Sequence, residues 1–264
     1  MIPSQVIPAE KVALFRNAVP FWMSLLLVPV ALIGAFHGGW TVILLPVVTW
    51  YFFSILDAFL GLNTSNADLD TEEGQLTWYK AITLIWAPIQ FALLFWMIWY
   101  VTGPGNAHLS ALETIVLFFG VGVITGTVGI NYSHELMHQK DRGERFLGDT
   151  LLAMVLYSHF RSEHLRVHHL HVGTPRDPVT ARYNEGFHRF FPRVLKDSLV
   201  SSFKAEQALL ARKNLPWTDR RNPFWRYWGL QAFMLVLAVL VGGWTGLALF
   251  LWQAVVAVWQ LELV

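Results

Sequence analysis

Long hydrophobic stretches alternate along the chain with one large polar block. Six of these stretches reach the length of roughly 20 residues that a helix needs to cross a bilayer. The pattern therefore predicts an all-α protein, an integral membrane bundle of six transmembrane helices that forms one domain over residues 1–264. The spans are expected near residues 18–36, 40–61, 80–101, 112–133, 227–243 and 244–264.

The polar block at residues 134–226 is too long for a simple loop, so we expect a helical cap made of short helices. It carries sixteen of the nineteen Lys and Arg residues, whereas the turns near 37–39 and 102–110 carry no charged residue. Because positively charged segments of membrane proteins stay in the cytoplasm, the N-terminus, the 62–79 loop and the cap are predicted to be cytoplasmic. We expect the protein in a bacterial inner membrane.

Composition narrows the classes of function. Charged residues make up 14% of the chain, against roughly a quarter in soluble domains. The net charge of +1 gives no reason to expect a nucleic-acid partner. The absence of cysteine excludes disulfides, an iron–sulfur cluster held by this chain and a thiol nucleophile.

Gly122 and Gly126 form a GxxxG pattern inside the fourth predicted span. In membrane helices this spacing favours close packing against a neighbouring helix. Space for a substrate tunnel is the alternative interpretation.

Seven of the ten histidines lie between residues 134 and 171, and five of them form two groups that each sit beside a predicted span. His134 and His138 are four residues apart, so on a helix they share a face and can bind one metal ion. His164 and His168 have the same spacing, and on an α-helix His169 points about a quarter turn away, towards a second metal. Imidazole is a good ligand for both iron and zinc.

The remaining histidines are weaker candidates. A lone histidine at an interface is usually an amphipathic side chain, and we interpret His37 and His108 in this way. His159, His171 and His188 are expected to lie beside the ligands or on the surface rather than to bind metal. Two clusters of ionisable residues at a membrane boundary, by contrast, usually mark a functional site.

The segment HELMH at residues 134–138 also fits the zinc protease signature, with Glu135 as general base. A zinc hydrolase needs three protein ligands and an open position, and five candidate ligands are present here. No late intramembrane aspartate completes such a site, and Glu262 is a weak substitute. A transporter is a third class, disfavoured because the histidines lie outside the spans.

The histidine groups resemble those of the membrane alkane monooxygenases, a branch of the fatty-acid desaturase and hydroxylase superfamily. That branch has HELxHK-like and EHxxxHH boxes, which residues 131–140 and 163–169 resemble here. A further segment of the branch, roughly TPxDPATSR, is matched by TPRDPVTAR at residues 174–182. Because that segment has no obvious role in metal binding, it indicates kinship rather than convergent spacing. Residues 50–57 also resemble the family.

The resemblance implies that two iron ions and O2 hydroxylate the terminal carbon of an alkane, with electrons from rubredoxin and its reductase. Glu135 and Asp177 match carboxylates of the family, and we expect them to orient the ligand imidazoles. Trp50 belongs to an aromatic segment that is a candidate wall of a substrate tunnel, with lipid-facing packing as the alternative. The iron ligands implied by the resemblance are His134, His138, His164, His168 and His169.

The family has a third histidine box, which follows a span like 244–264. The sequence ends at Val264, so we expect a truncated form that by itself is inactive or poor in metal. Related functions stay open: a fatty-acid desaturase, a lipid hydroxylase, or an oxygenase for methyl groups on aromatic rings. The TPRDPVTAR segment favours the alkane branch.

Overall fold

The computed structural model describes residues 18–60 and 76–263. It is 82% helical and contains no strand within the described residues, which confirms the all-α prediction. Lys11, Arg16 and most of the predicted 62–79 loop lie outside the described residues.

Five helical segments are long and apolar enough to cross a membrane, and they make the chain an integral membrane protein. The first runs over Ala18–His37 and includes η1 (Met23–Leu26) and α2 (Leu27–His37). The second, Gly39–Leu56, is built from η2 (Gly39–Ile43), α3 (Leu44–Val47), η3 (Val48–Phe52) and the start of α4 (Phe53–Leu60). The others are α5 (Thr77–Thr102), a continuous run of α6 (Ala111–Ile124), η6 (Thr125–Ile130) and α7 (Asn131–Met137), and α12 (Phe224–Leu263).

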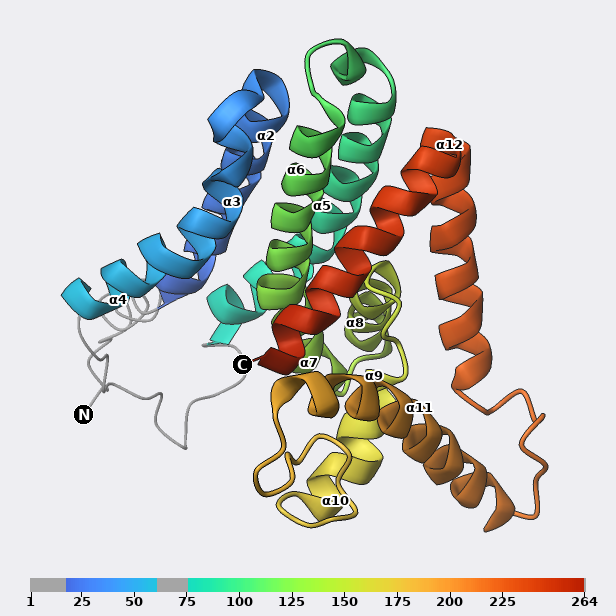
Figure 1. The fold of residues 1–264 in the computed structure, drawn as a ribbon. Coiled ribbons are helices and arrows are strands. Elements are labelled where there is room, and N and C mark those ends of the chain that lie inside the picture. Colours follow the sequence, from blue (N-terminus) through green and yellow to red (C-terminus); the bar gives the residue numbers. More distant parts are fainter. Residues whose placement is uncertain (1–17, 61–75, 264) are drawn as a thin grey trace, which may run out of the picture.

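The predicted count of six spans is not confirmed, because the fifth and sixth predicted stretches belong to the single 40-residue element α12. Its backbone leaves helical geometry only at Gly242 and Gly243, where Gly243 has a φ of 60°. Residues other than glycine rarely adopt that conformation. In Figure 1 the element has two legs that meet at this point, so the glycine pair separates two halves of the lengths expected for the last two spans.

The apolar helices run side by side, and their short connections gather at one end of the molecule (Figure 1). The turn between α2 and η2, the η5 turn (Pro104–Ala107) between α5 and α6, and the bend of α12 all lie at that end. The cap lies at the opposite end. This arrangement agrees with the predicted separation of the uncharged turns from the basic block.

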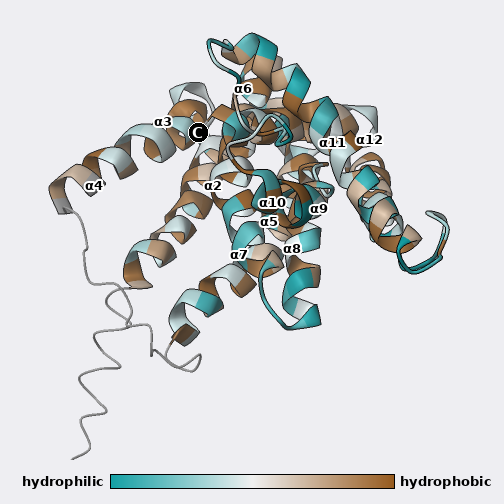
Figure 2. Cartoon of the chain, turned by 90° about the horizontal axis from the view of Figure 1, so that it is seen from below, coloured by the Kyte–Doolittle hydropathy of each residue, from teal (hydrophilic) through white to brown (hydrophobic). Residues whose placement is uncertain are grey.

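The cap contains α8 (Arg142–Met154), α9 (Phe160–Glu163), η7 (His164–His168), α10 (His169–His171) and α11 (Phe187–Ala211). With 25 residues, α11 is much longer than the short helices expected. Seen from the cap end, strongly hydrophilic residues gather near α7, α8 and α10, whereas the span helices show mostly hydrophobic residues (Figure 2).

The GxxxG pattern lies in close contact with the second leg of α12. A Cβ atom added to Gly122 would lie 2.6 Å from Cβ of Val256, and one added to Gly126 would lie 2.6 Å from the carbonyl oxygen of Ala257. Real side chains do not approach so closely, so the two glycines allow the helices to touch. The structure supports the helix-packing interpretation of this motif.

Candidate metal centre

The first histidine pair lies where the fourth apolar helix leaves the bundle. The helix continues as α7 past the apolar stretch, which places His134 and His138 one turn apart with ring centres separated by 4.9 Å. Just before it, η6 has π-helical geometry, a form that often marks functional sites. The predicted pairing of His134 with His138 on one face is therefore present.

The second histidine group lies on a π-helical turn rather than on an α-helix. In η7 the backbone hydrogen bonds join residues five apart instead of four, so residues five apart lie closer to one face than on an α-helix. As a result, Nε2 of His169 lies 2.9 Å from Nε2 of His164. The sequence-based expectation that His169 points away from His164 differs from the structure, because it assumed α-helical geometry.

The two groups converge on His164. Its Nε2 atom lies 2.8 Å from Nε2 of His134 and 2.9 Å from Nε2 of His169. Potential ligand atoms of His134, His138 and His164 all lie within 4.8 Å of one another. Three converging imidazole nitrogens cannot all be satisfied by one another, because a neutral ring has only one N–H donor. A metal ion can bind the lone pairs of several such nitrogens at once.

The electrostatics of this cluster favour neutral rings. Burial, followed by the neighbouring histidines His134, His169, His168 and His138, lowers the pKa of His164 to about 3. Burial and the neighbouring rings also lower the pKa of His138. Neutral imidazole is the form that binds metal, so at neutral pH these side chains offer free lone pairs without first losing a proton.

His168 is held by Asp177, which belongs to the TPRDPVTAR segment. Nδ1 of His168 lies 2.9 Å from Oδ2 of the fully buried Asp177 side chain. Thr180 donates its hydroxyl to the same carboxylate oxygen at 2.6 Å, and the Val179 amide donates to the other at 3.1 Å. A carboxylate on Nδ1 leaves Nε2 of His168 as the atom that can bind metal.

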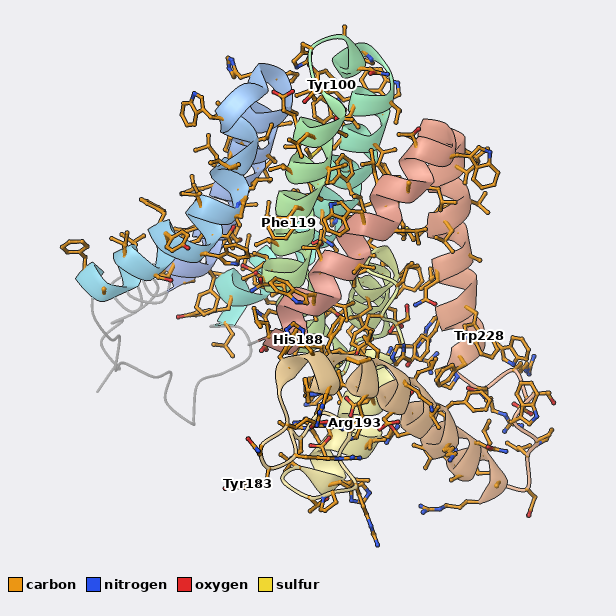
Figure 3. All side chains as sticks on the ribbon, in the orientation of Figure 1. Tyr100, Phe119, Tyr183, His188, Arg193 and Trp228 are labelled. Carbon is orange, nitrogen blue, oxygen red and sulfur yellow. The ribbon has the colours of Figure 1, made fainter. Side chains whose placement is uncertain are left out.

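Arg193 fixes the loop that carries Asp177. Figure 3 labels this side chain, which comes from α11 below the bundle. Its Nε and Nη2 atoms donate to both carboxylate oxygens of Glu185 at 2.7 and 2.6 Å, and it also donates to the carbonyl oxygens of Pro178 and Thr180 at 2.8 and 3.2 Å. Arg193 lies outside the TPRDPVTAR segment, on α11, so the sequence did not reveal its role.

Glu135 contacts His134 of the cluster, whereas the indole of Trp50 contacts Gln260 and Phe119. Oε1 of Glu135 lies 3.7 Å from Nδ1 of His134, although the carboxylate side chain is 65% exposed. The indole of Trp50 donates to Oε1 of Gln260 at 3.1 Å and packs edge-on against Phe119, which Figure 3 labels. The expected roles of Glu135 in orienting a ligand and of Trp50 in binding substrate stay predictions.

Glu163 is a buried carboxylate that the sequence analysis did not single out. It is 0% exposed, and neither of its oxygens has a hydrogen-bond partner among the described residues. Burial, with the charges of Asp177 and Glu262, raises the pKa of Glu163 to about 8. Its place beside His164 was visible in the sequence, but its complete burial was not.

A cavity of about 800 Å³ opens beside the first histidine pair. Its wall includes His134 and Glu135, together with apolar surface from Phe21, Val128 and Tyr132. The volume lies within the range of about 300–1,000 Å³ that is usual for ligand sites. A molecule in this cavity reaches the edge of the histidine cluster.

Comparison with known proteins gives consistent results. A family model described as fatty acid desaturase matches residues 109–264. Alkane 1-monooxygenase 2 of Pseudomonas aeruginosa is 31% identical over 232 residues, which cover 87% of this chain and 61% of that protein. Alkane 1-monooxygenase 1 of the same organism is 34% identical over 220 residues, covering 80% of this chain and 55% of that protein.

A more distant relative is the xylene/toluene monooxygenase hydroxylase component XylM of Pseudomonas putida. It is 28% identical over 215 residues, which cover 80% of this chain and 56% of that protein. The chain thus spans between 55% and 61% of the length of these three relatives.

Proposed function

Because the chain belongs to the fatty acid desaturase family, we propose that it hydroxylates the terminal carbon of alkanes with O2 at a histidine-ligated di-iron site. The observation that carries this proposal is the convergence of Nε2 atoms from both histidine groups on His164. The names of the relatives, alkane 1-monooxygenases, supply the substrate class.

The residues present fit iron. His134, His138 and His164 would hold one ion, and His168 and His169 are the candidates for the second. Imidazoles suit iron and zinc alike, but five such ligands exceed the three that a catalytic zinc ion takes from the protein. When bound, iron supplies the redox chemistry needed to oxidise an unactivated C–H bond, which zinc lacks.

The chain itself supplies binding and positioning. An alkane has no polar group and partitions into the bilayer, so burial against apolar side chains provides its binding energy, about 0.8 kcal/mol per methylene. The cavity beside His134 is the candidate path to the cluster. Asp177 orients the ring of His168, and Arg193 holds the loop that carries Asp177.

The proposed context follows from the topology. With the cap in the cytoplasm of a bacterial inner membrane, the histidine cluster faces the side on which soluble electron carriers occur. The cap region at residues 134–226 carries sixteen basic and ten acidic residues. This balance suits an acidic electron donor, for which we propose rubredoxin, and it also suits anionic lipid.

Hydroxylation of a methyl group on an aromatic ring is the second candidate. The likeness to the xylene/toluene monooxygenase component favours it. Three aromatic side chains line the cavity, Phe21, Tyr79 and Tyr132. A panel of linear alkanes and methylbenzenes separates these two substrate classes.

The test uses the purified full-length gene product. Metal content is measured by elemental analysis, and conversion of octane is followed under ¹⁸O2 with reduced rubredoxin. We expect bound iron, ¹⁸O in 1-octanol, and loss of both iron and product in His164→Ala. A single zinc ion with no labelled alcohol would contradict the proposal and favour a hydrolase.

A further inference from the structure

A second cavity lies between the second leg of α12 and the cap. Its volume is about 260 Å³, just below the range of usual ligand sites, about 300–1,000 Å³. Leu251, Ala254, Val255 and Val258 of α12 form one wall, with Leu195 of α11 opposite. Leu251 and Val255 are 41% and 56% exposed, so the cavity borders the lipid-facing surface.

Two aromatic side chains with polar atoms line this cavity, Tyr157 and His159, and the Tyr157 hydroxyl already donates to Oε1 of Glu262 at 2.9 Å. His159 contributes to its wall, and the buried Nε2 atom of this ring has no hydrogen-bond partner among the described residues. Its ring packs against Tyr157, with centres 4.5 Å apart. A buried polar atom without a partner is unfavourable and usually indicates a missing partner, either a ligand or a water molecule.

The shape of the cavity and the chemistry of His159 together indicate which kind of ligand fits. The α12 wall extends over eight residues, from Leu251 to Val258, and the helix rises by about 10 Å between the first and the last. A ligand that fits has an apolar chain of that length and a single polar group at the His159 end. Burial lowers the pKa of His159 to about 4, so at neutral pH the ring is uncharged and matches a neutral hydroxyl rather than a carboxylate ion.

We propose that this cavity binds a medium-chain primary alcohol, with its hydroxyl group hydrogen-bonded to Nε2 of His159 and its alkyl chain along α12. Binding of the alcohol is independent of catalysis. The further assignment of this alcohol as the reaction product, held at the lipid-facing surface before release, rests on the proposed function.

The cavity is close to the second histidine group. Tyr157, beside His159, stacks on Phe160, and Phe160 stacks on His164 with ring centres 5.4 Å apart. An alcohol bound at His159 is therefore separated from the cluster by aromatic rings. This position suits a molecule that has already left the reaction site.

The test is photolabelling of chelator-treated protein in phosphatidylcholine nanodiscs, with a diazirine-bearing 1-octanol as the probe. Mass spectrometry locates the label. We expect it within residues 155–159 and 251–258, with competition by excess 1-octanol but not by octane. His159→Phe keeps the ring volume but removes the hydrogen bond, and should lower labelling about three- to tenfold.

Two further variants keep the test decisive. His188→Phe changes an exposed histidine of α11, labelled in Figure 3, that does not line the cavity, and labelling should stay unchanged. Ala254→Phe leaves His159 in place but fills the cavity from a buried position of α12, and labelling should disappear.

Several outcomes would overturn the proposal. Equal labelling by a diazirine-bearing octane would make the cavity an ordinary acyl-chain groove. Full labelling of His159→Phe would mean that the alcohol makes no hydrogen bond to His159 and that water is the partner of its imidazole. Because the protein lacks metal in this experiment, alcohol binding without any octane hydroxylation by the metal-loaded, full-length gene product would retain the site and refute the proposed function alone.

Discussion

The imidazole of His168 and the carboxylate of Asp177 are joined by a contact of 2.9 Å between Nδ1 and Oδ2. The contact links a histidine of the second group to a segment nine residues later in the chain. It fixes the orientation of the ring and reserves Nε2 for a metal ion. A segment without ligands of its own is thereby connected to the candidate metal centre.

Asp177→Asn is expected to weaken metal binding about 10- to 100-fold, because the carboxamide no longer holds and polarises the His168 ring. Affinity is measured by chelator competition with Co²⁺ as an optical probe. Asp219→Asn, which changes a carboxylate paired with Arg221 away from the histidines, is the control and should bind normally. Equal loss in both variants, or lost folding of metal-free Asp177→Asn, would indicate a general structural role.

Gly126→Ala should destabilise the bundle by about 1–3 kcal/mol, because the added methyl group meets the backbone oxygen of Ala257, which cannot move alone. Gly229→Ala is the matched control, since no atom lies within 4 Å of its added methyl group. Alanine is the better helix former, by about 1 kcal/mol, so the control should be neutral or stabilising. Denaturation in detergent measures both, and equal stabilities would contradict the close packing.

The Asp149 carboxylate is 1% exposed and receives hydrogen bonds from Arg161 at 2.9 and 2.8 Å, with Arg226 2.8 Å away. Asp149→Asn should cost about 3–5 kcal/mol of unfolding free energy, because the largely buried Arg161 loses its counter-ion. Arg226→Met should cost about 0–1 kcal/mol, since that side chain is 43% exposed and water screens it. Equal losses in chemical denaturation would refute this ranking.

The ion pair between Glu185 and Arg193 predicts that the loop that carries Asp177 is sensitive to acid. Hydrogen bonds from the Arg193 guanidinium, then from the Arg182 amide, lower the pKa of Glu185 from 4.5 to about 2. Between pH 2 and 4.5 the Glu185 carboxyl binds more protons in the unfolded chain than in the folded one. The ion pair therefore stabilises the folded loop above pH 4.5, and this stabilisation is lost as the pH falls towards 2.

Hydrogen exchange over residues 178–185 measures this effect. Protection should fall between pH 4.5 and 2 after correction for the intrinsic exchange rate. Glu185→Gln cannot titrate, so its protection should change less across this window. The same decline in both proteins would assign the acid sensitivity to another group.

The sequence determined the features that depend on local patterns. Bilayer thickness sets the length of an apolar helix, so the span helices were visible as uninterrupted hydrophobic stretches. The spacing of His134 and His138 predicted their shared face, because α7 follows ordinary helical geometry. The GxxxG pattern likewise predicted a tight contact, although not that α12 is the partner.

The tertiary structure decided what depends on backbone register and on distant residues. The π-turn at residues 164–168 brings His169 to His164, and nothing in the spacing of the histidines distinguishes it from an α-helical turn. The orientation of His168 depends on Asp177, whose loop is held by Arg193 from another helix. The sequence by itself therefore predicted which side chains can bind metal, because ligand chemistry belongs to residue type. Their relative positions required the fold, because hydrogen bonds between separate segments determine where each ring points.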